Sequence, residues 1–155
     1  MNQFAQHVTA YIESQGHKTE TYTEDGSSFS SIRFRTRGSW FSLLVDEDDR
    51  GFVQLSCSCP LPEHVTADAV AMDILLRAQD RVKCVKFSAI DERRRLVGNV
   101  ELLLPEGDAV ERVFWRAVGM VESAMREAIN ELRDTVPARS AAEKFIAEFT
   151  TGGAA

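Results

Sequence analysis

The chain has 155 residues, with 18 Lys and Arg against 24 Asp and Glu, a formal net charge of −6 and 44% hydrophobic residues. A chain of this length buries roughly 70% of the surface that its unfolded form exposes, so its stability requires neither a metal ion nor a disulfide. The odd count of three cysteines and the lack of an N-terminal signal segment predict a reducing, cytoplasmic setting. No window approaches the ~18 consecutive apolar residues of a membrane-spanning helix, so we expect no membrane partner.

The acidic excess is dispersed along the chain. Residues 1–60 and residues 61–155 each carry three more acidic than basic side chains. Because a nucleic-acid partner requires a concentrated positive surface, we expect no nucleic-acid binding.

The first predicted element is a helix over residues 2–14, in which apolar side chains recur at spacings of three and four. Gly16 then supplies a stop. The apolar period next changes to two, which is typical of half-buried strands. Strands are predicted over 18–24, 28–37, 40–45 and 52–59, with short turns between them.

The second half begins with a predicted helix from Thr66 to Asp80 or Arg81. A second hairpin follows, with strands over 83–90 and 96–104. A long helix is predicted over 108–134, and its broad apolar surface indicates contact with more than one neighbour. Pro137 is predicted to separate this helix from a short helical tail.

This order of elements predicts an α+β fold with a mainly antiparallel sheet, because every link between strands is a short turn. The N-terminal helix comes first, and the long C-terminal helix is expected to pack on the sheet. We expect one domain over residues 1–136, followed by a helical tail and frayed C-terminus over 137–155.

The cysteines offer a candidate metal site. Cys57 and Cys59, with His64 five residues later and Cys84 beyond, supply soft ligands. Structural zinc sites, however, use Cys pairs with two to four intervening residues and a second such pair. Core packing of Cys57 and Cys59, which continue the apolar face of a strand, is therefore favoured over metal binding, and we expect no cofactor.

Two groups of arginines form a candidate anion or RNA surface. Arg33, Arg35 and Arg37 alternate along one face of a strand, and Arg93 to Arg95 occupy a turn. The alternative is cross-strand pairing with acidic residues such as Glu20 and Glu24. Convergence of the two arginine groups in space would discriminate between these interpretations.

The long helix and the tail carry more large apolar side chains than one buried stripe requires. Their positions predict that those of the long helix lie on its outer side, away from the buried stripe. One explanation is burial within the chain, with the tail folding back; the other is a dimer interface or a peptide-binding groove. The candidate partner-binding residues are Trp115, Val118, Met125, Ile129, Phe145, Ile146 and Phe149.

Together these patterns resemble the YbjN-like family of bacterial proteins over roughly residues 1–134. The resemblance rests on Cys59-Pro60-Leu61-Pro62, the helix through Leu75-Leu76-Arg77, the hairpin from Val85-Lys86-Phe87 to Leu102-Leu103-Leu104, and the helix after Asp108. Gln79 stands near the place where that family often has asparagine. The resemblance implies a fold like that of type III secretion chaperones, which commonly dimerise and hold an extended segment of a partner. Members are described as sensory transduction regulators, a label without known chemistry.

No nucleophile motif, phosphate-binding loop or paired histidine motif occurs in the sequence. We therefore expect a non-enzymatic, cytoplasmic interaction protein, chaperone-like or regulatory, that binds a segment of an unknown protein partner as a homodimer. The alternative is a small-ligand-binding or enzymatic domain with a pocket between the sheet and the long helix.

Overall fold

The structure is a computed structural model of the whole chain. It describes residues 3–23, 26–46, 48–49, 51–61, 65, 69–82, 84–90, 94–104 and 109–151. Side chains are described throughout these ranges except at residues 69, 70, 109, 111 and 136–151. Within the described part no helix is long and apolar enough to cross a membrane.

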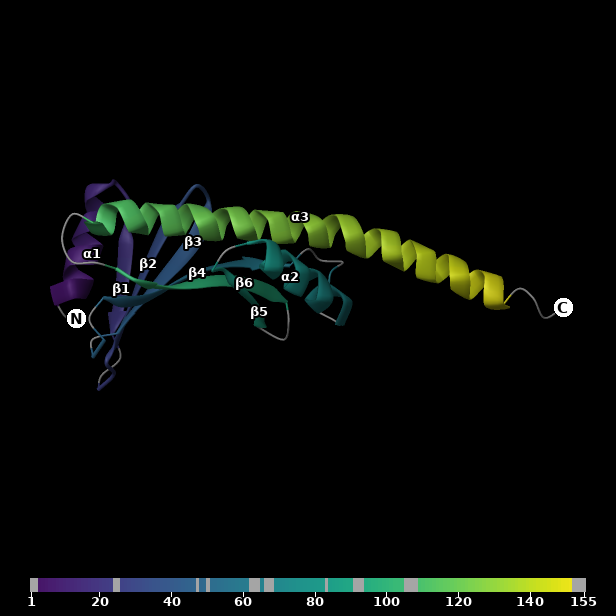
Figure 1. Ribbon diagram of the computed structural model, residues 1–155, viewed down its shortest axis with the longest axis horizontal. Helices are drawn as coiled ribbons and strands as arrows, with labels where there is room; N and C mark the ends of the chain where they lie inside the picture. Colours follow the sequence, from purple (N-terminus) through teal and green to yellow (C-terminus); the bar gives the residue numbers. More distant parts are fainter. Residues whose placement is uncertain are drawn as a thin grey trace.

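The described elements form an α+β fold, as the sequence predicts. Every sheet pairing is antiparallel, and the strand order is β1-β2-β3-β4-β6-β5 (Figure 1). Strands β5 and β6 therefore join the first four through β4, a pairing that no short turn dictates. The elements are α1 (Gln3–Ser14), β1 (Thr19–Thr23), β2 (Phe29–Thr36), β3 (Ser39–Asp46), β4 (Phe52–Pro60), α2 (Ala69–Arg81), β5 (Lys86–Ile90), β6 (Arg95–Leu103) and α3 (Ala109–Thr151).

The core lies between the sheet and α3. Because side chains alternate along a strand, the even-numbered positions of β2 and the odd-numbered positions of β3 and β4 face the helices, and all but the last of β2, the first of β3 and the last of β4 are buried. Aromatic rings from three elements meet there. Phe34 lies 5.4 Å from Phe41 and 5.6 Å from Phe114, measured between ring centroids. The ring of Tyr11 in α1 completes this cluster in a T-shaped contact, 6.2 Å from Phe114 between centroids, so α1, the sheet and α3 meet at one ring.

Gly98 in the middle of β6 permits a close approach of α3. A Cβ atom at this position would lie 2.7 Å from Sδ of Met125, inside the contact limit. Glycine weakens the interior of a strand, and it is typically found there where another element approaches closely. The thioether of Met125 occupies the space that a side chain would otherwise fill.

Helix α3 has several neighbours, as its broad apolar surface predicts. It contacts β4, β6 and α2, and its first turns pack on the aromatic cluster. Figure 1 shows that it runs along the sheet and then continues beyond the other elements. At 43 residues it is about 64 Å long.

The predicted break at Pro137 is wrong, because α3 is continuous from Ala109 to Thr151. Proline removes one intrahelical hydrogen bond and crowds the preceding turn, which bends a helix without always ending it. The next residues include alanines 138, 141 and 142, and alanine is the strongest helix former. The segment is therefore an extension of α3 rather than a separate tail helix.

Candidate functional site

One face of the sheet carries the described helices and the other face, here called the open face, carries none. Of the six large hydrophobic side chains that are exposed in the described part, five point to the open face by their register. Leu103 is the most exposed, at 71%, and only Leu76 of α2 lies elsewhere. A cluster of exposed large apolar side chains is typical of an interaction surface. The five are Tyr22, Phe29, Trp40, Ile90 and Leu103.

A row of polar side chains crosses the open face at right angles to the strands. We call it the polar row, and each member is the direct register partner of the next. It extends across all six strands, because register aligns side chains of the same face. Its members, from β1 to β5, are Glu20, Arg33, Ser42, Ser56, Asn99 and Lys86.

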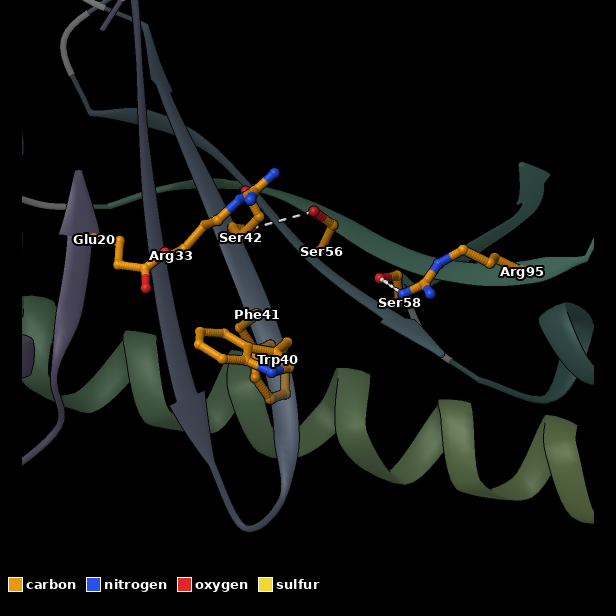
Figure 2. Close-up of a pocket in the computed structure, with 8 residues that line it drawn as sticks. All are labelled: Glu20, Arg33, Trp40, Phe41, Ser42, Ser56, Ser58 and Arg95. Atoms are coloured by element: carbon orange, nitrogen blue, oxygen red, sulfur yellow. Dashed lines mark hydrogen bonds between the residues drawn. The ribbon is translucent and has the colours of Figure 1, made fainter. Parts of the chain in front are cut away.

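A pocket of about 410 Å³ opens over the first four members of the polar row. Figure 2 shows Arg33 and Arg95 at either side of a group of serines, with Trp40 below them. Ser56 donates a hydrogen bond to the carbonyl of Ser42 at 3.2 Å. The lining is thus mainly polar, with two guanidinium groups and one carboxylate. The residues that line it are Glu20, Arg33, Trp40, Phe41, Ser42, Ser56, Ser58 and Arg95.

The pocket brings together one member of each arginine group that the sequence singled out. Arg33 comes from β2, and Arg95 comes from the start of β6. Arg95 Nη2 donates to Ser58 Oγ at 2.9 Å, whereas Arg33 forms no hydrogen bond or ion pair within the described part of the chain. Glu20 faces Arg33 in register, but the predicted ion pair between them is not formed. Arg93 and Glu24 lie outside the described residues.

The other two arginines of the first group are engaged differently. Arg35 lies over the ring of Trp40, 6.0 Å from its centroid, and so shares the open face. Arg37 has a φ of 48° in the β2–β3 turn and reaches Glu122 of α3, with 3.6 Å between Nη1 and Oε2. The predicted row of three guanidinium groups on one face is therefore wrong for Arg37, because the left-handed turn directs its side chain toward the helix.

The arginines of the open face were singled out from the sequence, but its serines and its exposed apolar side chains were not. Serines at alternating positions opposite the core, such as Ser42, Ser56 and Ser58, are the signal that marks it. Short hydroxyl side chains leave room for a hollow between Trp40 and Arg95. Their convergence depends on the strand order, which local patterns do not determine.

The cysteines pack as the strand pattern predicts. Cys57 is buried in the core, Cys59 is half-buried against it, and Cys84 is exposed. Burial raises the pKa of Cys57 from 9.0 to about 11, with smaller contributions from Cys59 and Glu122. Burial also raises the pKa of Cys59, while Arg95 opposes that rise. Among the described residues no three His, Cys, Asp or Glu side chains are placed to hold a metal ion; His64 lies outside them.

The raised pKa of Cys57 predicts a loss of stability at alkaline pH. The unfolded chain releases the thiol proton near pH 9, before the folded chain does, so the stabilisation is complete below pH 9 and is lost as the pH rises toward 11. The decline amounts to up to about 3 kcal/mol of unfolding free energy. Urea denaturation between pH 8 and 11 measures it. Cys57→Ala should flatten the decline and Cys84→Ala should not; an equal decline in the Cys57→Ala variant would contradict the assignment.

The candidate partner-binding residues of α3 do not lie on its outer side. Val118 and Met125 are buried in the core, while Trp115 and Ile129 are half-buried and pack against it. Trp115 contacts the ring of His17 at 4.9 Å between centroids. The apolar surface of α3 is broad because the helix has several neighbours. The prediction that these four residues lie on the outer side of the helix is therefore wrong. The side chains of Phe145, Ile146 and Phe149 lie outside the described residues.

The alternative function, a small-ligand-binding or enzymatic domain, needs a pocket between the sheet and the long helix, and the pocket described above does not lie there. Between the sheet and α3 the described residues form the close-packed core that includes Phe34, Phe41 and Phe114. The pocket over the polar row is on the opposite side of the sheet. It does not supply the ligand site between sheet and long helix that the alternative function needs.

These features define a class of α+β protein in which three helices cover one face of a six-stranded antiparallel sheet. No family model and no curated protein matches the chain. Solved structures with this fold do exist. An uncharacterised protein from Methanothermobacter thermautotrophicus superimposes with a TM-score of 0.61 and 8% identity, covering 83% of this chain and 96% of its own.

The second structure is YbjN from E. coli, for which a role as a transcription regulator has been suggested. Its TM-score is 0.55 at 15% identity, and the match covers 84% of this chain and 91% of YbjN. The chain therefore has a YbjN-like fold, in agreement with the resemblance in its sequence.

Proposed function

We propose that the protein is a non-enzymatic, cytoplasmic interaction protein, chaperone-like or regulatory, which binds a segment of another protein on the open face and acts as a homodimer. Membership of the YbjN-like family forms part of this proposal. The shared fold supports it, because a regulatory or interaction role is compatible with the suggested role of YbjN.

The observation that carries the proposal is the composition of the open face. Five of the six exposed large hydrophobic side chains in the described part are on it, interleaved with serines and arginines. Protein interfaces are enriched in Tyr, Trp, Phe and Arg. Trp40, 49% exposed and next to Arg35, has the character of a residue that dominates binding energy.

The homodimer is supported by the length of α3. The helix continues beyond the sheet and the other helices (Figure 1). Most helical stability in proteins comes from tertiary packing, so a partner surface would stabilise this extension. A second copy of the chain can provide that surface for both extensions at once.

The test is a selection of random 12-residue peptides displayed on phage against the immobilised full-length protein. Peptides that are enriched are resynthesised, and their affinities are measured by fluorescence anisotropy. We expect Trp40→Ser to weaken binding about tenfold or more. Leu76→Ser is the matched control, because Leu76 is also a large exposed hydrophobic residue but lies on α2, and it should leave binding unchanged.

Light scattering on the same protein preparations measures the molar mass and so tests whether the protein is a homodimer. Twice the chain mass of 17.3 kDa is expected. A strictly monomeric mass would refute the homodimer. Failure to enrich any peptide, or equal losses in the Trp40→Ser and Leu76→Ser variants, would refute segment binding on the open face.

A further inference from the structure

Two unmet polar groups of opposite kind lie in the same polar row. Arg33 is an exposed cation without a hydrogen bond or ion pair to any described residue. Oδ1 of Asn99 is buried and has no hydrogen-bond partner in the described part. Leaving a buried acceptor unpaired is costly, so such a group needs an explanation. Because Asn99 as a residue is only half-buried, rotation of its side-chain amide can bring Oδ1 to the surface.

The two groups are separated by three strand spacings. Arg33 is paired in register with Ser42, Ser42 with Ser56, and Ser56 with Asn99. Neighbouring strands are ~4.8 Å apart, so the backbones at the two ends of this stretch are about 14 Å apart. An extended chain advances at most ~3.5 Å per residue, so about four residues span the same distance. The separation therefore fits a short extended segment that crosses the strands.

Recognition on this face must come from side chains. The backbone groups of β2, β3, β4 and β6 are paired with neighbouring strands on both sides, in the plane of the sheet. A crossing segment therefore cannot add as a strand here, in contrast to the sheet edges β1 and β5. Arg33 and Asn99 supply a cationic donor and an acceptor, while the hydroxyls of Ser42 and Ser56 lie between them.

The charge around the pocket selects the occupant. The planar guanidinium group of Arg33 matches an oxyanion through paired hydrogen bonds, and Arg95 at the other side of the pocket adds positive potential. Glu20 is the one carboxylate in the pocket lining. The chain as a whole carries a charge of −6, so it repels a run of acidic residues but accepts a single oxyanion at Arg33.

We propose that the polar row binds an extended, mostly neutral segment of the partner protein that carries one side-chain oxyanion. Arg33 holds this oxyanion, and a backbone N–H about four residues away in the segment is donated to Asn99. The proposal rests on the proposed function for the kind of occupant. The oxyanion is the carboxylate of Asp or Glu or the phosphate of a phosphoserine, since both present the same chemistry to a guanidinium group.

The enriched 12-residue peptides provide the probes. We expect them to share one Asp or Glu. Exchanging that residue for Gln or Asn should weaken binding to the wild-type protein about tenfold or more, because a charge-assisted hydrogen bond is lost. The same exchange should have no effect on binding to the Arg33→Ala variant. A third peptide carries phosphoserine at this position: tighter binding than the acidic peptide assigns the phosphate, and weaker binding assigns the carboxylate.

Three further variants separate recognition from structure. Arg77→Ala removes an equal charge from α2, where Arg77 pairs with Asp73, and should not change peptide affinity. Glu20→Gln should increase affinity, because it removes a neighbouring carboxylate that repels an oxyanion held by Arg33. Asn99→Leu should weaken peptide binding while raising the urea midpoint, because it removes a buried acceptor that the free protein leaves unpaired.

The two proposals fail in distinguishable ways. Enriched peptides without an acidic residue, or equal losses with the wild-type and Arg33→Ala proteins, overturn the oxyanion site and leave segment binding intact. Absence of any enriched peptide overturns segment binding itself. A single-stranded RNA octanucleotide that displaces the acidic peptide more strongly than the phosphoserine peptide does would also overturn the inference, since the face would then be a nucleic-acid surface.

Discussion

Phe114→Ala should destabilise the protein by about 3 to 5 kcal/mol, which approaches the total stability of many domains of this size. The ring of Phe114 is fully buried and is the point where α1, the sheet and α3 meet. Its removal takes away contacts with Phe34 at 5.6 Å, Trp115 at 5.1 Å and Tyr11 at 6.2 Å between centroids. The rigid backbones of three elements cannot close around the cavity, so little of the loss is recovered.

Urea denaturation followed by far-ultraviolet circular dichroism measures this effect. Leu76→Ala is the control, because Leu76 is 57% exposed on α2 and its truncation should change the free energy of unfolding by less than about 0.5 kcal/mol. If Phe114→Ala cost no more than Leu76→Ala, the cluster would not be the centre of the core. Because the peptide-binding variants lie on the other side of the sheet, Trp40→Ser should behave like the Leu76→Ala control.

Much of the secondary structure was predictable because most of the elements have a clean apolar period. The strand pattern of residues 28–37, for example, places Ile32 and Phe34 on one side, and both are buried in β2. The boundaries of α1 and β4 each differ from their predicted ranges by a single residue. Local alternation is enough for this, because burial of one face of a strand fixes which residues point inward.

The candidate site was only half predictable. Arg33 and the turn arginines near residue 95 were visible as charged groups, but their placement around one pocket required β6 to pair with β4. This pairing joins strands far apart in the chain, and no local signal encodes it. The direction of the Arg37 side chain depends on one left-handed φ in a turn. The residue pattern alone does not specify this angle.

The large apolar side chains of the long helix were predicted to face outward, but they pack against the core. A periodic pattern shows which residues of a helix are apolar, but it does not show how many neighbouring elements cover them. Helix α3 contacts β4, β6 and α2, so a wide apolar surface is what its position requires. The exposed large apolar residues are instead mainly on the open face, where five of the six strands contribute one each and no helical period reveals them.

We expect Val118→Asp to destabilise the protein strongly. Val118 is 4% exposed within the core, so the variant must bury a carboxylate or expose the core to water. Burying an unpaired charge is expected to cost more than about 3 kcal/mol, and the variant should be partly unfolded at 25 °C. The fraction folded, from circular dichroism and urea denaturation, measures the effect.

The control is the next residue, Gly119→Asp, which introduces the same charge on the exposed side of α3. A Cβ at Gly119 has no heavy atom within 4 Å, and aspartate is a slightly better helix former than glycine. We therefore expect a change within about 0.5 kcal/mol. If Val118 belonged instead to a surface between two copies of the chain, Val118→Asp would yield a folded monomer with unchanged unfolding free energy. Loss of folding in Val118→Asp alone would assign this face of α3 to the core and leave the open face as the surface available to partners.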